Sequence, residues 1–358
     1  MRMRTFMKIF LFLILLYAFF VSIELLGSGF KLLGKDFAES LLATTANPIV
    51  GLIIGVLATS LIQSSSTTTS ITVGLVAAGG LSLRGAIPII MGANIGTTIT
   101  NSIVSMAHIN NRKEFKRALA AATVHDFFNI LAVIVLFPIE MFFHPIEKLA
   151  ISLANAIFGI GGMKFMSPLK FATKPTTTAL ISLIQNPWVL IVLSLLMLFC
   201  ALFFFVKVMR SLVISKVEVI IDGFLFRNDL TALTLGAVIT AIIQSSSITT
   251  SLIVPLAGAG ILTLRKIYPY TLGANLGTTI TALLAAMITM NISALTVALS
   301  HIVFNIFGIL IFFPLKRLPL ALASGFANLA VRSRKTIIIA VGTYFLLYLL
   351  PIIYLILR

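Results

Sequence analysis

Long apolar runs separated by short polar breaks dominate this chain. Seven runs of about 20 residues predict helices that each cross a membrane. They cover residues 6–26, 86–107, 117–138, 188–206, 267–289, 294–314 and 336–357. Two further apolar stretches, 48–80 and 229–260, are each interrupted near the middle by the sequence Gln-Ser-Ser-Ser. The halves on either side have about 15 residues, too few to cross a bilayer, so each stretch predicts a re-entrant hairpin of two half-helices.

Composition agrees with this pattern and excludes a soluble domain. The chain is 59% hydrophobic and 10% charged, with a mean hydropathy of +1.13, whereas soluble domains are about 25% charged. The fold class expected is an all-α polytopic membrane protein. A net charge of +16 would suggest nucleic acid in a soluble chain, but here the basic residues cluster at the ends of apolar runs. They therefore indicate membrane topology, and no nucleic-acid partner is expected. Cys200 is the single cysteine, which excludes an intrachain disulfide.

The polar clusters belong to an internal repeat. Residues 63–100 align without a gap with residues 244–281, and 23 of the 38 positions are identical. Further along, the offset between the copies falls from 181 to 176, so that His125, Phe128 and Asn129 match His301, Phe304 and Asn305. The repeat predicts four parts. They are a first repeat at 1–138, a connector at 139–187, a second repeat at 188–314 and a C-terminal segment at 315–358.

Basic residues predict that the two repeats have opposite orientations. Arg2, Arg4 and Lys8 favour a cytoplasmic N-terminus, and the basic run at 112–117 falls on the same side two crossings later. The connector at 139–187 then lies outside, and the second repeat begins from that side. The sequence therefore predicts a multi-pass protein of the plasma or inner membrane with two inverted-topology repeats. Many secondary transporters have this architecture and bind substrate and coupling ions where the repeats meet.

The broken hairpins carry chemistry suited to an anion and to small cations. Serine hydroxyls and the free N–H groups of a half-helix N-terminus bind anions, and that terminus carries about half a positive charge. Hard, neutral oxygens suit sodium. The residues that supply such oxygens are Gln63, Gln244, Asn94, Asn275, Thr97, Thr98, Thr278 and Thr279. Neither motif contains Lys or Arg, so a polyvalent anion would depend on co-bound cations for charge balance.

Asp126 is the acidic residue inside the predicted span 117–138, and its counterpart in the second repeat is Ile302. An intramembrane carboxylate predicts a cation ligand or a proton acceptor.

Each of these features also has a structural interpretation. Runs of serine and threonine can pack helices or bond to the preceding turn. The glycines near Asn94 and Asn275 can serve close packing or expose carbonyl groups, and Asp126 can extend toward the basic loop. His125 and His301 can lock a helix contact. For the duplicated motif we favour binding, because a packing role does not require Gln-Ser-Ser-Ser, Gly-Ala-Asn and Gly-Thr-Thr to recur in register.

At these residues the chain resembles the type II sodium-dependent phosphate cotransporters, whose two inverted repeats each carry a Gln-Ser-Ser-Ser signature. The resemblance covers about 47–138 and 228–314, and it implies cotransport of inorganic phosphate with sodium as the coupling ion and no other cofactor. It implies a phosphate site at Gln63, Ser64, Ser65, Ser66, Gln244, Ser245, Ser246 and Ser247. It implies sodium sites at Gln63, Ser64, Asn94, Thr97, Thr98, Asp126, Gln244, Ser245, Asn275, Thr278 and Thr279. An aspartate at position 126 implies electrogenic transport.

The chain departs from the animal members of this family. Its connector 139–187 is short, lacks cysteine and contains an amphipathic stretch, Pro145–Phe158, that we expect at the membrane interface. A soluble regulatory domain after Arg358, as in many bacterial relatives, is not expected. These features are typical of a minimal bacterial-type member, and the oligomeric state, including a homo-oligomer, stays open.

Three functions remain possible from sequence. The first is a sodium-coupled, electrogenic phosphate importer that works by alternating access in the bilayer. The second, the alternative to it, is a phosphate exporter, or a sodium-independent anion channel or uniporter. The third is a membrane-embedded serine hydrolase, which we disfavour because the serines lack a nucleophile elbow. We therefore expect a transporter and not an enzyme.

Overall fold

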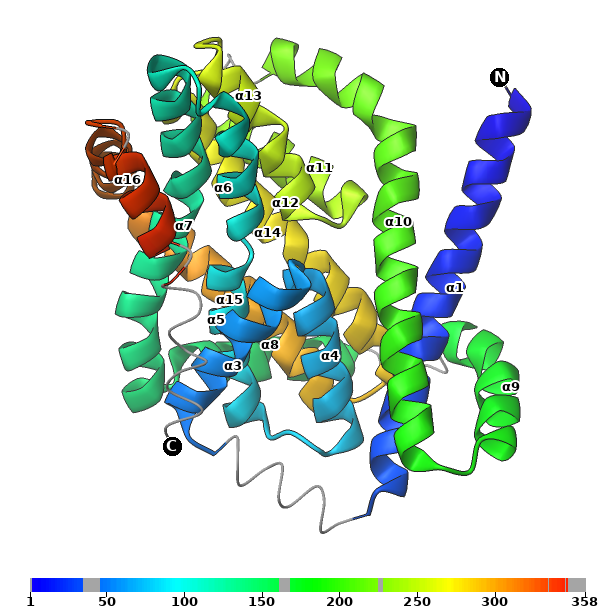
Figure 1. Ribbon diagram of the computed structural model, residues 1–358. Helices are drawn as coiled ribbons and strands as arrows, with labels where there is room; N and C mark the ends of the chain where they lie inside the picture. Colours follow the sequence, from blue (N-terminus) through cyan, green and yellow to red (C-terminus); the bar gives the residue numbers. More distant parts are fainter. Residues whose placement is uncertain are drawn as a thin grey trace.

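The computed structural model describes residues 2–34, 46–160, 168–224, 228–333, 335–344 and 346 (Figure 1). Throughout this part of the chain the regular structure is helical. The first half contains α1 (Arg2–Leu32), α3 (Pro48–Ile62), α4 (Ser65–Ala78), α5 (Leu83–Gly96), α6 (Ile99–Ser105), η1 (Met106–His108), α7 (Arg112–Phe143), α8 (Pro145–Ile160) and α9 (Pro168–Leu183). The second half contains α10 (Pro187–Phe224), α11 (Asp229–Ile243), α12 (Ser246–Ser251), α13 (Ile253–Gly258), α14 (Leu264–Thr289), α15 (Ile292–Phe312) and α16 (Arg317–Ala330).

Among the described residues, six helical segments are long and apolar enough to cross a membrane, as an all-α polytopic membrane protein requires. They are Met7–Leu32, Leu83–His108, Arg112–Phe143, Pro187–Val208, Leu264–Thr289 and Ile292–Phe312. They coincide with the first six spans predicted from the sequence. The seventh predicted span, 336–357, is described only in part, as the short apolar helix Lys335–Tyr344; the rest of it lies outside the described residues.

Both Gln-Ser-Ser-Ser clusters fall at helix breaks, as the sequence predicts. α3 ends at Ile62 and α4 begins at Ser65, and in the second copy α11 ends at Ile243 and α12 begins at Ser246. Figure 1 shows the α3–α4 hairpin entering from one end of the molecule and the α11–α13 hairpin entering from the opposite end. Their broken points meet near the middle.

The second hairpin has an additional break for which the sequence gives a cause. Pro255 stands where the first copy has Gly74, and proline has no N–H to donate to the carbonyl four residues earlier. That carbonyl belongs to Ser251, where α12 ends before α13 begins. In the first copy the equivalent helix, α4, continues without interruption.

Glycines allow each hairpin to lie directly against the following helix. α3 packs along α5, and α11 packs along α14. A Cβ atom added at Gly92 would overlap the carbonyl oxygen of Leu52, and one at Gly273 would overlap that of Leu233. Of the two interpretations of these glycines, the structure supports close helix packing.

Corresponding helices from the two halves of the chain make reciprocal contacts. α8 packs on α15 and α16 packs on α7, while α1 and α10 lie side by side. α8 contains the amphipathic stretch Pro145–Phe158, and it buries Ile146, Ala150 and Ala154. The division of the chain into parts and the orientation of the repeats in a bilayer stay predictions.

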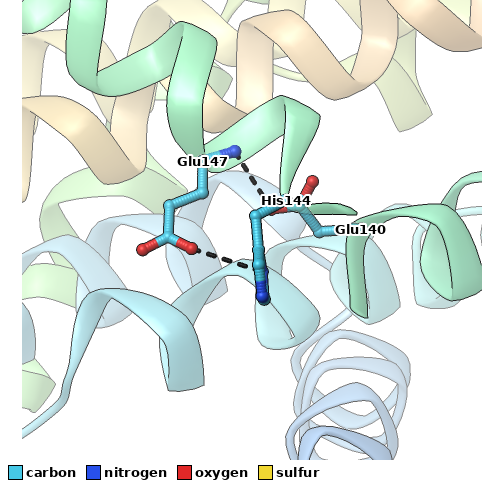
Figure 2. A group of neighbouring side chains, drawn as sticks. All are labelled: Glu140, His144 and Glu147. Carbon is cyan, nitrogen blue, oxygen red and sulfur yellow. Dashed lines mark hydrogen bonds and ion pairs between the residues drawn. The ribbon is translucent and has the colours of Figure 1, made fainter. Parts of the chain in front are cut away.

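A cluster of ionisable side chains joins α7 to α8 (Figure 2). The buried Glu140 carboxylate accepts the backbone N–H groups of Ile146 (2.7 Å) and Glu147 (3.0 Å), and so caps the first turn of α8. Glu147 in turn pairs with His144 Nδ1 (3.4 Å) and with Arg84 Nε (3.3 Å). Ligand atoms of Glu140, His144 and Glu147 lie within 4.8 Å of one another. Because both carboxylates already have partners, the cluster is explained as a joint between helices.

Candidate functional site

The two glutamines that open the duplicated motifs share an unusual backbone conformation. Gln63 has φ 55° and Gln244 has φ 62°, both in the left-handed region, which costs about 1–2 kcal/mol for a residue other than glycine. The next residues, Ser64 and Ser245, are N-caps whose Oγ atoms accept the backbone N–H three residues later, at 3.2 and 3.4 Å. The chain therefore turns sharply at each motif and directs a new helix N-terminus toward the break.

Side chains of the two motifs meet across the repeats. Ser66 Oγ donates to the backbone carbonyl of Gln244 (3.2 Å), and Ser247 Oγ donates to the carbonyl of Thr97 (3.2 Å). Thr281 Oγ1 lies 3.3 Å from Ser66 Oγ and donates to Gln244 Oε1 at 2.5 Å. The structure thus brings Ser66 of the first motif and Gln244 and Ser247 of the second into one polar region, with Thr281 of α14 beside them.

The electrostatic character of this region comes from backbone groups and hydroxyls. The first turns of α4 and α12 leave N–H groups without an intrahelical partner at the breaks. Ser65 and Ser66 are 4% exposed, and Ser246 is 2% exposed. These helix termini attract negative charge, while the glutamine and threonine oxygens can accept a cation.

The two glutamines differ in environment although their sequences match. The Gln244 side chain is buried, whereas Gln63 is exposed and makes no hydrogen bond within the described part of the chain. Thr281 bonds to Gln244, but its counterpart Thr100 has a buried Oγ1 without a partner among the described residues. The site is therefore closed around one glutamine and open around the other.

The helices that follow the hairpins also differ. Both contain the sequence Gly-Thr-Thr-Ile-Thr, at 96–100 and 277–281. The first copy is broken between α5 and α6 at Thr97 and Thr98, whereas α14 continues through the equivalent residues. The break exposes the Thr97 carbonyl to the Ser247 hydroxyl. One local sequence therefore adopts two conformations, which sequence analysis did not predict.

The threonines proposed as sodium ligands bond back to their own helices. Thr97 Oγ1 and Thr98 Oγ1 each donate to a carbonyl of the preceding turn at 3.0 Å, and Thr278 and Thr279 do so at 3.1 and 2.7 Å. A hydroxyl that donates its proton in this way keeps its oxygen lone pairs available. The geometry is compatible with both the packing and the cation-binding interpretations.

A buried network of asparagines links the repeats beside the helix breaks. Asn275 Nδ2 donates to Asn129 Oδ1 (2.8 Å) and to Asn305 Oδ1 (2.7 Å). Asn129 Nδ2 donates to the carbonyl of Asn94 (2.7 Å), and His301 Nε2 lies 3.4 Å from Asn94 Oδ1. Sequence analysis proposed Asn94 and Asn275 but missed Asn129 and Asn305. Their recurrence at the 176-residue offset was the signal that could have identified them.

Asp126 occupies a different part of the interior. It is 2% exposed, and its Oδ2 accepts the hydroxyl of Tyr344 at 2.6 Å. Tyr344 belongs to the helix Lys335–Tyr344, after the second repeat. Nothing in the repeat pattern points to Tyr344, because Tyr344 lies outside the aligned copies.

A further acidic side chain inside a span was overlooked in the sequence. Glu24 lies in α1, and its Oε2 accepts the hydroxyl of Thr173 on α9 at 2.7 Å. It also lines a cavity of about 140 Å³ together with Lys31, Ala77 and Thr289. Its position within the apolar run 6–26 was the available signal.

Broken helices, paired repeats and six apolar spans together define a polytopic membrane protein with the architecture of secondary transporters. The chain matches the sequence profile of the Na+/Pi-cotransporter family over residues 18–167 and 177–346, and it belongs to that family. This is a family of transporters and not of enzymes.

Curated relatives agree with this assignment. The chain is 34% identical to human sodium-dependent phosphate transport protein 2B over 91% of its own length, and 34% identical to sheep sodium-dependent phosphate transport protein 2A over 92%. It spans 62% and 65% of the length of these two relatives. No solved structure matches the chain.

Proposed function

We propose that this protein is a sodium-coupled transporter of inorganic phosphate. The observation that carries the proposal is the meeting of the two Gln-Ser-Ser-Ser motifs at facing helix breaks, through Ser66, Gln244 and Ser247. The names of the relatives, sodium-dependent phosphate transport proteins, support the choice of substrate and coupling ion.

In this proposal phosphate binds between the breaks, at residues 63–66 and 244–247. Backbone N–H groups and serine hydroxyls donate to its oxygens. Helix termini alone balance a small part of a polyvalent anion's charge, and neither motif supplies Lys or Arg. Sodium ions bound at the nearby amide and hydroxyl oxygens, and at the Asp126 carboxylate elsewhere in the interior, supply the remaining charge. Phosphate and sodium therefore bind more tightly together than alone, which is the physical basis of coupling.

Transport then requires the site to open to each side in turn. The two conformations of Gly-Thr-Thr-Ile-Thr support such a change, because exchanging them between the repeats would transfer the open environment of Gln63 to Gln244. This is the alternating-access mechanism expected for paired repeats.

Two contacts hold the far ends of the hairpins and serve as gates in this mechanism. Arg117 of α7 donates through Nε (2.9 Å) and Nη2 (2.5 Å) to the carbonyl of Gly258, at the end of α13. Asn291, before α15, donates through Nδ2 to the carbonyl of Ala77 at the end of α4, at 3.4 Å. Gly258 and Ala77 are equivalent positions, 181 residues apart. We name these contacts the Arg117 latch and the Asn291 latch.

The orientation follows from the distribution of basic residues. With a cytoplasmic N-terminus, the Arg117 latch closes the inner end and the Asn291 latch closes the outer end. The protein is then an electrogenic importer of the plasma or inner membrane, with the bilayer as its surroundings. An exporter with the same site would differ only in the gradients that drive it.

A paired substitution tests the site. Replacing Ser66 and Ser247 together with alanine removes one hydroxyl donor from each repeat, while Ser182→Ala, on an exposed face of α9, is the control. We expect the double variant to lose at least about tenfold in apparent phosphate affinity, as two lost hydrogen bonds of about 1 kcal/mol each imply. An unchanged phosphate affinity in a folded double variant would remove these serines from the site.

The role of Asp126 is tested by Asp126→Gly. We expect this variant to retain sodium-dependent phosphate uptake but to lose the net charge carried per phosphate. Current and labelled phosphate uptake would be measured in the same preparation. A variant that still carries the parent's charge per phosphate would contradict the role assigned to Asp126.

A further inference from the structure

We propose that the cavity beside Glu24 and Lys31 is an entry site that binds phosphate together with sodium at the outer end of the transporter. The inference rests on the proposed function, including its orientation, and adds a second site to it. We name this space the α1 cavity. It lies between α1, α4 and α14 and has a volume of about 140 Å³. The residues that line it include Glu24, Gly27, Ser28, Lys31, Ala77 and Thr289.

Two opposite charges line the α1 cavity without pairing with each other. Glu24 and Lys31 lie two turns apart on α1, and so share one face of that helix. Within the described part of the chain neither forms an ion pair. Glu24 Oε2 accepts the Thr173 hydroxyl at 2.7 Å, and Oε1 has no hydrogen-bond partner among the described residues. Because a carboxylate inside an apolar span is costly unless it is paired, this arrangement indicates a ligand.

The charges and the volume of the cavity indicate the class of ligand. Lys31 can donate to an anion, whereas the Glu24 carboxylate and the hydroxyl oxygens of Ser28 and Thr289 can bind a hard cation. An anion alone would be repelled by Glu24, and a cation alone would be repelled by Lys31. A phosphate ion accompanied by sodium carries both signs. The volume equals that of about four or five water molecules in the liquid, which is enough for this pair.

The α1 cavity adjoins the outer gate. Ala77 lines the cavity, and its carbonyl accepts the Asn291 latch at 3.4 Å. Thr289 also lines the cavity, and its Oγ1 accepts the backbone N–H of Asn291 at 3.3 Å. Ions bound in the cavity therefore lie directly beside the contact that has to open before they can reach the site between the helix breaks.

Protection of a cysteine tests the entry site. A Cβ atom added at Gly27 has open space, so Gly27→Cys in a Cys200→Ser background places a thiol in the cavity. A membrane-impermeant thiol reagent would be applied from the outer side to the full-length protein in proteoliposomes. We expect inorganic phosphate with sodium to slow labelling about threefold at about twice the dissociation constant, as simple occupancy predicts. Phosphate with potassium, and sodium chloride alone, should leave the rate unchanged.

Two charge substitutions show whether this protection depends on the cavity. Lys31→Gln and Glu24→Gln should each remove it. Lys148→Gln is the matched control, because it removes an exposed positive charge from α8, on the same predicted outer side. It should leave the protection intact. Labelling that phosphate and sodium together do not slow, or protection that survives both cavity substitutions, would overturn the inference.

The Ser66→Ala, Ser247→Ala double variant separates the entry site from the site between the breaks. It weakens the inner site and leaves the α1 cavity intact, so Gly27→Cys should still be protected. Loss of protection in this variant would mean that labelling reports ions bound between the breaks, and would overturn the entry site. Failure of the proposed function has a different result, because the Cys200→Ser parent would then not accumulate phosphate with sodium, whether or not Gly27→Cys is protected.

Discussion

Replacing Arg117 with methionine removes the Arg117 latch while keeping most of the side-chain volume. The lost contact is a two-pronged, charge-assisted hydrogen bond to the Gly258 carbonyl, at 2.9 and 2.5 Å. Hydrogen bonds to charged groups contribute about 1.5–3 kcal/mol, and we reduce this to about 1 kcal/mol because Arg117 lies at the exposed end of α7. A change of 1 kcal/mol raises the ratio of inner-open to inner-closed molecules about fivefold.

Cysteine labelling measures this ratio. Ala257, beside the latch on α13, is 2% exposed, so a cysteine at this position should react only when the inner end opens. The background would carry Cys200→Ser, which removes the single native cysteine. We expect a membrane-impermeant thiol reagent on the predicted cytoplasmic side to label Ala257→Cys about fivefold faster in Arg117→Met.

Lys116→Met is the control, because it removes an exposed positive charge from the same turn of α7. It should leave the labelling rate at the parent's value. If Arg117→Met is labelled no faster than Lys116→Met, the Arg117 latch does not hold the inner end closed, and the assignment of the gates is refuted.

Further predictions concern the interior. Asn275→Asp replaces an amide that donates two buried hydrogen bonds with a carboxylate that donates none. We expect the free energy of unfolding to fall by about 2–4 kcal/mol, which would be measured as a lower thermal midpoint in detergent. An unchanged midpoint would contradict the asparagine network. Gly273→Ala places a methyl group against a carbonyl of α11 and should lower the free energy of unfolding by about 1–3 kcal/mol or more. Gly325 has open space around it, so Gly325→Ala should leave the free energy of unfolding unchanged. Gln244→Ala should lower both stability and transport, because its side chain is bonded inside the site. Gln63→Ala should lower transport alone, so equal destabilisation by the two glutamine variants would argue against the asymmetry.

Much of this architecture could be predicted because it depends on local pattern. Apolar length identified six spans, and the duplicated Gln-Ser-Ser-Ser located both helix breaks within a few residues. The extra break before α13 also has a local cause in Pro255. These features follow from the membrane's demand that backbone groups be satisfied within each helix or at a polar break.

Features that depend on tertiary contacts could not be predicted in the same way. The break at Thr97 and Thr98 occurs in a sequence that is helical in the second repeat, so the surroundings decide its conformation. The bond from Tyr344 to Asp126 joins residues 218 positions apart and lies outside the repeat. The repeat offset could have identified Asn129 from the sequence, but only the folded structure shows that Asn129 contacts Asn94 and Asn275.

Labelled phosphate uptake into proteoliposomes tests the central claim most directly. Purified full-length protein would be given an inward sodium gradient or an equal potassium gradient, with the membrane potential set inside-negative by valinomycin or held near zero. Sodium-coupled, electrogenic transport predicts uptake that exceeds equilibrium only with sodium and is faster at the negative potential. Equal uptake in sodium and potassium, without accumulation above equilibrium, would contradict coupling and favour an anion channel or uniporter.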